Sequence, residues 1–277
     1  IEVLEKYESE AELAQALKGV QALIVRSDKV GAQTIAPADD LKIIVRAGAG
    51  YDNIDLEAAT KAGVVVMNTP GQNANAVAEL AIGLMIYMAR NQFNPSTGSE
   101  IAGKTLGIQG FGNVGSLIAA KALALGMKVR AFDPVKSDEE MLVRGVEPTS
   151  SVKTLYADCD YISLNLPLVT VTERSVGYDL LSAMPKGGVL INTARKEIVD
   201  ESGLERALEE RSDIKYASDV APDNYAALRE KFGLRVYANS KKMGAQTAEA
   251  NLNAGLAAAR QIVDYFETGN VKFQVNK

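Results

Sequence analysis

The sequence has 277 residues, 47% hydrophobic and 23% charged, which is typical of a globular protein with a substantial core. A net charge of −5 without a basic stripe argues against nucleic acid or an anionic membrane as a partner. A single cysteine and no histidine exclude a disulfide framework, argue against a metal site and favour a reducing, cytoplasmic location. Any proton transfer must therefore proceed without imidazole.

Short apolar runs and helical patterns alternate along the first hundred residues. The run 1–7 is strand-like, so we expect further residues before it. Three later runs are predicted strands: 20–27, 42–47 and 64–69. An apolar helical pattern covers 75–91, and the polar stretch 91–103 is interpreted as a crossing into a second domain. This crossing is short. Either the protein has a short crossing, or residues near 91–98 are absent from this sequence.

The stretch 104–133 has the order of a dinucleotide-binding βαβ unit. An apolar run leads into Gly-Phe-Gly-Asn-Val-Gly at 110–115, a helical pattern follows, and a second apolar run ends on Asp133. Asp133 would accept hydrogen bonds from the adenosine ribose, and it would repel a 2′-phosphate, so NAD is favoured over NADP. The alternative interpretation is an ordinary glycine turn.

Each glycine of this turn has its own expected role. Gly110 would permit the tight turn, Gly112 would let a pyrophosphate approach the backbone, and Gly115 would let helix and strand pack closely. The pyrophosphate would lie at the start of the helix, beside Asn113 and Val114, because free N–H groups and the helix dipole favour an anion there.

Strands and helices continue to alternate to residue 244, which predicts a parallel sheet covered on both faces. A last helix is expected over 245–267. The predicted fold is α/β with two doubly wound parallel-sheet domains. A Rossmann domain, 99–244, would be inserted into a flavodoxin-like substrate domain made of 1–98 and 245–277. Ligands would bind between them, at the carboxyl ends of the strands.

Two of the segments that follow predicted strands carry arginine. In the segment 46–55, glycine-rich backbone amides could hold a carboxylate, with Arg46 nearby for a second anion. A tight turn beside a surface arginine is the alternative. In the segment 192–195, Arg195 could clamp a carboxylate and polarise a carbonyl, or it could form a structural salt bridge.

Two further segments carry an acid and a pair of lysines. Asp219 could accept a hydrogen bond from a carboxamide at the nicotinamide site, or it could cap a helix. Lys241 and Lys242 lie at a strand-to-helix junction, where adjacent lysines are usually only solvated.

Five motifs together resemble the D-isomer-specific 2-hydroxyacid dehydrogenases: RAGAGYDNIDLEAA, VVVMNTPGQNANAVAELAIGLM, GKTLGIQGFGNVG, INTAR and KKMGAQTAEA. Within that family they are most similar to the phosphoglycerate dehydrogenases, in a short form without the C-terminal regulatory domain. The resemblance implies a homodimer, formed through the NAD domain, that oxidises D-3-phosphoglycerate to 3-phosphohydroxypyruvate in the phosphorylated serine pathway. A glyoxylate or hydroxypyruvate reductase, or a non-catalytic NAD-sensing protein, is the alternative.

The family's catalytic trio is arginine, glutamate and histidine. The arginine falls on Arg195, but Lys242 stands at the histidine position and Asn224, beside Asp223, at the glutamate position. A lysine pKa, ordinarily about 10.4, must fall toward neutrality for efficient proton exchange. Loss of the glutamate and the nearness of Lys241 and Arg195 would lower it, which predicts Lys242 as the acid–base. Lys242 could instead be an electrostatic anchor, and Lys241 or Asp223 could transfer the proton.

The remaining predicted contacts are those with the substrate and with the cofactor. Arg46 is the expected ligand of the 3-phosphate, with Arg26 a weaker second. The residues expected to hold the acid are Gly48, Ala49, Gly50 and Asn73. The resemblance places Pro167 beside the adenosine and Thr193 and Asp219 on the nicotinamide side.

Overall fold

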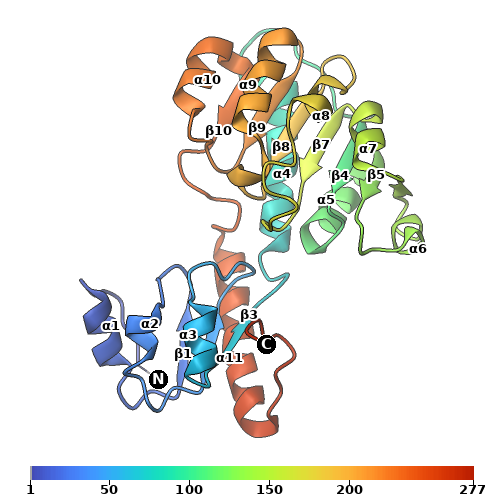
Figure 1. The fold of residues 1–277 in the computed structure, drawn as a ribbon. Helices are drawn as coiled ribbons and strands as arrows, with labels where there is room; N and C mark the ends of the chain where they lie inside the picture. Colours follow the sequence, from blue (N-terminus) through green and yellow to red (C-terminus); the bar gives the residue numbers. More distant parts are fainter. Residues whose placement is uncertain (1) are drawn as a thin grey trace. The chain divides into compact units, whose positions relative to one another are not determined.

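The computed structural model describes residues 2–277, which form two compact units (Figure 1). Unit 1 runs up to Asn73 and resumes at Thr247–Lys277, and unit 2 is Ala74–Gln246. These bounds differ from the expected domain boundaries because helix α4 (Ala74–Ala89) and the polar stretch 91–103 belong to unit 2. The reason is packing: α4 buries Met85 and Met88 in one core with the sheet of unit 2. The division into substrate and NAD domains stays a prediction.

Unit 2 is built on a seven-stranded parallel sheet in the order β10-β9-β8-β7-β4-β5-β6. The chain winds outward from β4 to β6, returns to β7 beside β4, and then winds outward again to β10. This confirms the doubly wound Rossmann order. The strands are β4 (Thr105–Gln109), β5 (Lys128–Phe132), β6 (Glu147–Pro148), β7 (Tyr161–Leu164), β8 (Val189–Asn192), β9 (Lys215–Ser218) and β10 (Val236–Ala238).

Helices cover both faces of this sheet (Figure 1). Successive strand residues point to opposite faces, so Tyr161 lies in one core and Ile162 in the other. The first core holds α4, α5 (Asn113–Ala124) and α6 (Asp138–Leu142). The second holds α7 (Val152–Asp158), α8 (Tyr178–Ser182), α9 (Glu201–Glu210) and α10 (Tyr225–Phe232). This double covering explains the continuous apolar runs of the strands.

Unit 1 contains a three-stranded parallel sheet, β1 (Ala22–Val25), β2 (Ile43–Arg46) and β3 (Val65–Asn68), in that order. Helices α1 (Glu10–Ala16), α2 (Ala32–Ile35), α3 (Leu56–Lys61) and α11 (Ala248–Thr268) complete it. Ala254 and Ala258 of α11 pack with Ile43 and Val45 in one core. The finer description as a flavodoxin-like sheet stays a prediction.

The strand expected at 1–7 is wrong for residues 2–7, and Ile1 lies outside the described residues. Val3 is 80% exposed and Leu4 is 49% exposed, so these side chains enter no core. Apolar alternation alone forms no strand where neither a partner strand nor a buried face is available. Among residues 2–277, no helix combines the length and the apolar character needed to cross a bilayer.

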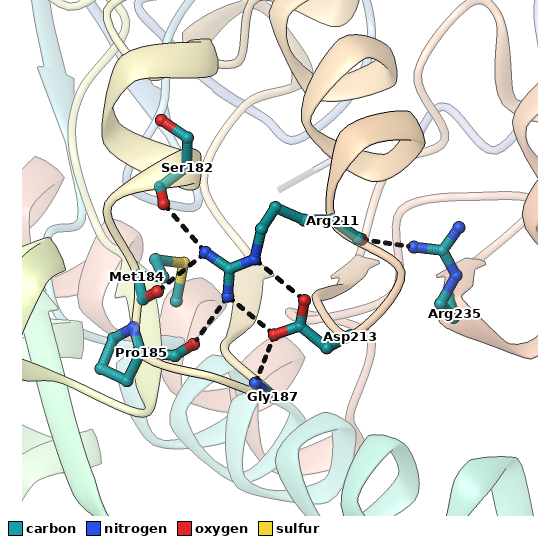
Figure 2. Close-up of polar contacts among 7 residues, drawn as sticks. All are labelled: Ser182, Met184, Pro185, Gly187, Arg211, Asp213 and Arg235. Carbon is teal, nitrogen blue, oxygen red and sulfur yellow. Dashed lines mark hydrogen bonds and ion pairs between the residues drawn. The ribbon is translucent and has the colours of Figure 1, made fainter.

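An arginine network joins the amino ends of β8 and β9 (Figure 2). The Arg211 guanidinium donates to three carbonyls of the turn after α8, those of Ser182, Met184 and Pro185. It also donates to both carboxylate oxygens of Asp213, to Oδ1 at 2.9 Å and to Oδ2 at 2.7 Å, and the same Oδ2 accepts the Gly187 N–H at 2.7 Å. Arg235 donates to the Arg211 carbonyl at 2.8 Å. Hydrogen bonding from Arg211 holds the pKa of Asp213 well below its usual range.

Candidate active site

Two of the three glycines in the turn after β4 are required by the backbone, and the third leaves open space beside it. Gly110 has a φ of +93°, a conformation that L side chains rarely adopt. A Cβ on Gly115 would lie 2.1 Å from the Gly110 carbonyl oxygen, so the helix start and the strand end approach closely. A Cβ on Gly112, in contrast, would meet nothing within 4 Å. Space beside Gly112 is therefore open to a ligand, as a pyrophosphate requires.

The start of α5 is suited to an anion. Gly112 is the N-cap residue, and it provides no side chain to bond the first-turn amides. Gly112 and Asn113 are exposed, whereas Val114 is half-buried. The N–H groups of the first helical turn and the helix dipole both favour negative charge here. This geometry fits the predicted position of the pyrophosphate.

Asp133 links the end of β5 to the glycine turn. One carboxylate oxygen accepts the Phe111 N–H at 2.7 Å, and the other accepts the Val135 N–H at 2.9 Å. The side chain is thus oriented by main-chain groups and remains half-buried. The second oxygen also accepts the Lys136 N–H at 3.3 Å, whereas the oxygen bonded to Phe111 has one protein donor and keeps capacity for a ribose hydroxyl.

A cavity of about 740 Å³ lies between the segments that follow β5 and β7. Its lining combines apolar residues, among them Phe132, Pro134 and Leu166, with charged residues such as Lys153 and Arg174. The volume is within the range of small-molecule sites. Pro167 itself is exposed, and its carbonyl accepts the Thr172 hydroxyl at 2.6 Å. The cavity reaches Phe132 and Pro134, the two neighbours of Asp133 in the sequence, and an adenosine site there stays a prediction.

The turn after β8 presents Thr193 and Arg195. Asn192 closes this turn, because its side chain donates to the Arg195 carbonyl at 2.9 Å and accepts the Ala194 N–H at 3.0 Å. Thr193 is 7% exposed, and its hydroxyl makes no hydrogen bond within residues 2–277. Arg195 is half-buried, and its guanidinium donates to the Ala194 carbonyl at 3.0 Å. A buried hydroxyl that lacks a protein partner is suited to a ligand.

The turn after β9 is held by two residues that the sequence analysis missed. Lys196 forms an ion pair with Asp223, and hydrogen bonding to this carboxylate raises the pKa of Lys196. Glu201 accepts the Asp223 N–H at 2.8 Å and the Asn224 N–H at 3.3 Å. Glu201 lies at the start of α9, so its position was visible in the sequence, but its partners were not. Asp223 is therefore engaged by Lys196.

Lys241 and Lys242 are both exposed, in the segment between β10 and α11. Asp219 caps no helix: it is 1% exposed, and it accepts the N–H groups of Met243 and Gly244. The carboxyl ends of β4, β5, β7, β8, β9 and β10 meet at one edge of the sheet. The structure therefore gathers the predicted site residues of unit 2 along that edge.

The other predicted site residues belong to unit 1. Arg46 ends β2, and its guanidinium folds over Gly48, where a Cβ would lie 1.6 Å from a guanidinium nitrogen. The Gly48 N–H donates to the Arg46 carbonyl at 2.8 Å, so this amide is engaged within the turn. The Ala49 carbonyl accepts the Asn68 side chain at 2.6 Å. Arg26, Gly50 and Asn73 are half-buried.

Comparison with known proteins places this geometry in a family. The NAD binding domain of the D-isomer specific 2-hydroxyacid dehydrogenases matches residues 85–232. The chain belongs to this family. It is 36% identical to the hydroxypyruvate reductase of Thermotoga maritima, over 95% of this chain and 90% of that protein. It is also 36% identical to the D-3-phosphoglycerate dehydrogenase of Methanocaldococcus jannaschii, over 91% of this chain and 51% of that protein.

A solved structure extends the similarity. The NAD⁺-bound 3-phosphoglycerate dehydrogenase of Entamoeba histolytica is 46% identical over 99% of this chain and 88% of that chain, with a TM-score of 0.89. The chain spans about half the length of the curated phosphoglycerate dehydrogenases that it matches. The cofactor of the family is NAD, and the open face of Gly112, the uncapped start of α5 and the Thr193 hydroxyl fit it.

Proposed function

We propose that this chain oxidises D-3-phosphoglycerate to 3-phosphohydroxypyruvate with NAD, as in the first step of phosphorylated serine biosynthesis. The observation that carries the proposal is the 46% identity, over 99% of the chain, to the phosphoglycerate dehydrogenase of Entamoeba histolytica. Arg46 supports a phosphorylated substrate, because a guanidinium can bind phosphate through two parallel hydrogen bonds. A cytoplasmic homodimer formed through the NAD domain belongs to the same proposal.

The chemistry is assigned to two residues of unit 2. Bound NAD would supply the hydride acceptor. Arg195 binds the substrate carboxylate and polarises the C–O bond at the reacting carbon. Neutral Lys242 takes the hydroxyl proton as that carbon is oxidised, and protonated Lys242 returns it in the reverse direction. The Lys196–Asp223 ion pair supports Lys242 over Asp223, since Asp223 is already engaged.

Binding is assigned to the remaining predicted residues. The proposed cofactor contacts are Gly110, Gly112, Asn113, Val114, Gly115, Asp133, Pro167 and Thr193. Arg46 binds the 3-phosphate, and Arg26 is a weaker second ligand for it. The proposed contacts to the acid are the backbone of Gly48, Ala49 and Gly50 and the side chain of Asn73. Because the Gly48 N–H is engaged in its own turn, Ala49 and Gly50 are the stronger candidates.

Reduction of hydroxypyruvate is the second candidate. The hydroxypyruvate reductase of Thermotoga maritima is 36% identical to this chain, as is the phosphoglycerate dehydrogenase of Methanocaldococcus jannaschii, so both substrates have support from relatives. The two keto acids, 3-phosphohydroxypyruvate and hydroxypyruvate, differ only by the phosphate, so the contribution of Arg46 to binding separates the two candidate functions.

The test is a pH profile of initial rates for the parent, Lys242→Met and Arg46→Met. Substrates are D-3-phosphoglycerate with NAD, and hydroxypyruvate or glyoxylate with NADH. We expect Lys242→Met to lower kcat about a thousandfold and to remove its ionisation from the profile. We expect Arg46→Met to raise KM at least about tenfold for phosphoglycerate only. Lys186→Met, which removes an exposed lysine after α8, is the matched control.

Two outcomes would contradict the proposal. A higher kcat/KM for hydroxypyruvate or glyoxylate, unaffected by Arg46→Met, would establish the reductase instead. Full activity in Lys242→Met would move the proton transfer to Lys241 or Asp223.

A further inference from the structure

Two main-chain carbonyls of the turn after β2 are held by the end of β3. The Gly48 carbonyl accepts the Thr69 N–H at 3.0 Å, and the Ala49 carbonyl accepts the Asn68 side-chain amide at 2.6 Å. Asn68 is the last residue of β3, which pairs in parallel with β2, so both donors lie beside the turn. Consecutive carbonyls of the turn therefore point to the same strand end.

The direction of these carbonyls fixes the N–H groups that follow them. A trans peptide is planar, with its C=O and N–H pointing in opposite directions, and the peptides of this turn are trans. Because the Gly48 carbonyl points to β3, the Ala49 N–H points away from it, and the Gly50 N–H does the same across the next peptide. In an extended strand, consecutive N–H groups point to opposite edges. Here both turn to one side, as in the main-chain nests that bind anions.

Both N–H groups are available to a ligand. Neither donates a hydrogen bond in the part of the chain that the structure describes, and Ala49 is exposed while Gly50 is half-buried. The Arg46 guanidinium lies over Gly48, so positive charge stands next to the two N–H groups. A carboxylate, with two acceptor oxygens, matches two N–H donors on one side of a turn beside a cation.

A longer chain of hydrogen bonds supports the Ala49 N–H. The Gln261 side-chain amide, in α11, donates to the Asn68 carbonyl at 3.1 Å. The N–H of that same peptide belongs to Thr69, and it donates to the Gly48 carbonyl. Peptide groups linked in this way polarise one another, which makes the last N–H of the chain a stronger donor. Helix α11, β3 and the turn after β2 all belong to unit 1.

We propose that Asn68 is a positioning residue, which holds the Ala49 carbonyl so that the Ala49 and Gly50 N–H groups together bind the carboxylate of the 2-hydroxy acid. Gln261 supports the same turn through the Asn68 carbonyl. The inference rests on the proposed role of Ala49 and Gly50 in binding the acid. Asn68 acts through the turn, without a contact of its own to the acid. Its loss weakens binding because hydrogen bonds to an ionised group are roughly twice as strong as neutral ones.

The first test uses the cofactor-free protein and glycolate, the simplest 2-hydroxy acid, so it does not depend on turnover. Glycolate is titrated while the amide resonances of Ala49 and Gly50 are followed by NMR, and uncharged glycolamide is the control probe. We expect only glycolate to shift both resonances to saturation. Asn68→Leu keeps a similar volume without the amide donor, and we expect it to raise the Kd for glycolate at least about tenfold.

Two further variants complete the titration. Gln261→Met removes the donor to the Asn68 carbonyl, and we expect it to raise the Kd for glycolate about threefold. Asn270→Leu is the matched control, because it removes an asparagine amide that donates to Asp264 near the C-terminal end of α11. We expect its Kd and its Ala49 and Gly50 resonances to match those of the parent.

Steady-state kinetics separate positioning from a merely structural role. In Asn68→Leu we expect the KM for D-3-phosphoglycerate to rise about tenfold, with kcat and the Kd for NADH each within about threefold. A residue that served only the fold would lower the melting temperature and the active fraction, and would leave the KM unchanged.

The outcomes distinguish this inference from the proposed function. Glycolate that shifts neither resonance in the parent, or an unchanged Kd in Asn68→Leu, would overturn the positioning role. If Asn68→Leu does not fold, Gln261→Met decides, and an unchanged Kd there would overturn the inference. A parent that does not turn over phosphoglycerate would overturn the proposed function, while the glycolate titration still decides whether Asn68 orients a carboxylate site.

Discussion

The two ends of the unit 2 sheet differ in how completely their polar side chains are paired. At the amino end, all five N–H donors of Arg211 have acceptors, namely three carbonyls and the two oxygens of Asp213 (Figure 2). At the carboxyl end, three buried oxygens make no hydrogen bond within residues 2–277. They are Asn165 Oδ1, Thr193 Oγ1 and Asn224 Oδ1.

The position of these oxygens explains the difference. Asn165 and Thr193 each follow a strand end by one residue, and Asn224 begins α10 after the turn that follows β9. A buried polar group left unpaired costs about 1–3 kcal/mol, so such groups are rare unless something else pairs with them. The amino end therefore stabilises the sheet, whereas the carboxyl end keeps polar capacity for ligands. Substitutions at the amino end should accordingly change the stability of the protein, and substitutions at the carboxyl end should change its affinity for ligands.

Among the substitutions that distinguish the two ends of the sheet, Gly112→Ala should have the largest effect. The added Cβ meets no protein atom within 4 Å, so we expect an unchanged melting temperature. It would occupy the face where a pyrophosphate approaches the backbone, and we expect NADH affinity to fall about a hundredfold, or about 2.7 kcal/mol. Fluorescence titration with NADH and thermal unfolding measure the two quantities.

Gly83→Ala is the matched control, because its Cβ also meets nothing within 4 Å and it lies in α4 of the same unit. We expect its NADH affinity to equal that of the parent. An equally tight complex in Gly112→Ala would show that the carboxyl end of β4 does not carry the cofactor.

Asp213→Asn tests the amino end. The pKa of Asp213 is lowered in the folded protein, first by hydrogen bonding from Arg211, so its stabilisation is fully present above the unfolded pKa of about 3.9. We expect the variant to lose about 2 kcal/mol at pH 7, because charged hydrogen bonds are lost. The difference from the parent should shrink as pH falls below about 4.

Urea unfolding at pH 7, 5, 4 and 3 measures this difference, and NADH titration at pH 7 should show no change in affinity. A stability difference that stays constant down to pH 3 would argue against an ionised Asp213 as its source.

The sequence predicted the sheet of unit 2 better than the boundaries of the units. Strand ends before Gly110, Asp133 and Thr193 could be located because apolar runs stop at polar or glycine residues. The run 75–91 is apolar on most faces, so its pattern could not show which unit would bury it. Helices α1 and α2, of 7 and 4 residues, are too short for a periodic signal and were missed.

The sequence indicated where the residues of the candidate site lie along the chain, but not which residues they contact. Arg195, Asp219 and Lys242 were located by motif, yet nothing in the sequence indicated that Asp219 accepts backbone amides two residues from a lysine. Such contacts join segments about 20 residues apart, and only the packing of β9 against β10 brings them together. The Lys196–Asp223 ion pair was missed for the same reason, as it spans two strand-end turns.

Thr193→Val should have the smallest effect of these substitutions, and it tests the role of a single hydroxyl. Valine has nearly the shape of threonine without the hydroxyl, and the Thr193 hydroxyl has no hydrogen-bond partner within residues 2–277. We therefore expect stability to hold or to rise by about 1 kcal/mol, because an unsatisfied polar atom is removed from a buried site. If the hydroxyl pairs with the cofactor, NADH affinity should fall about fivefold, or about 1 kcal/mol. Urea unfolding and NADH titration on one preparation decide the point: lower stability with unchanged affinity would mean that the hydroxyl serves the fold.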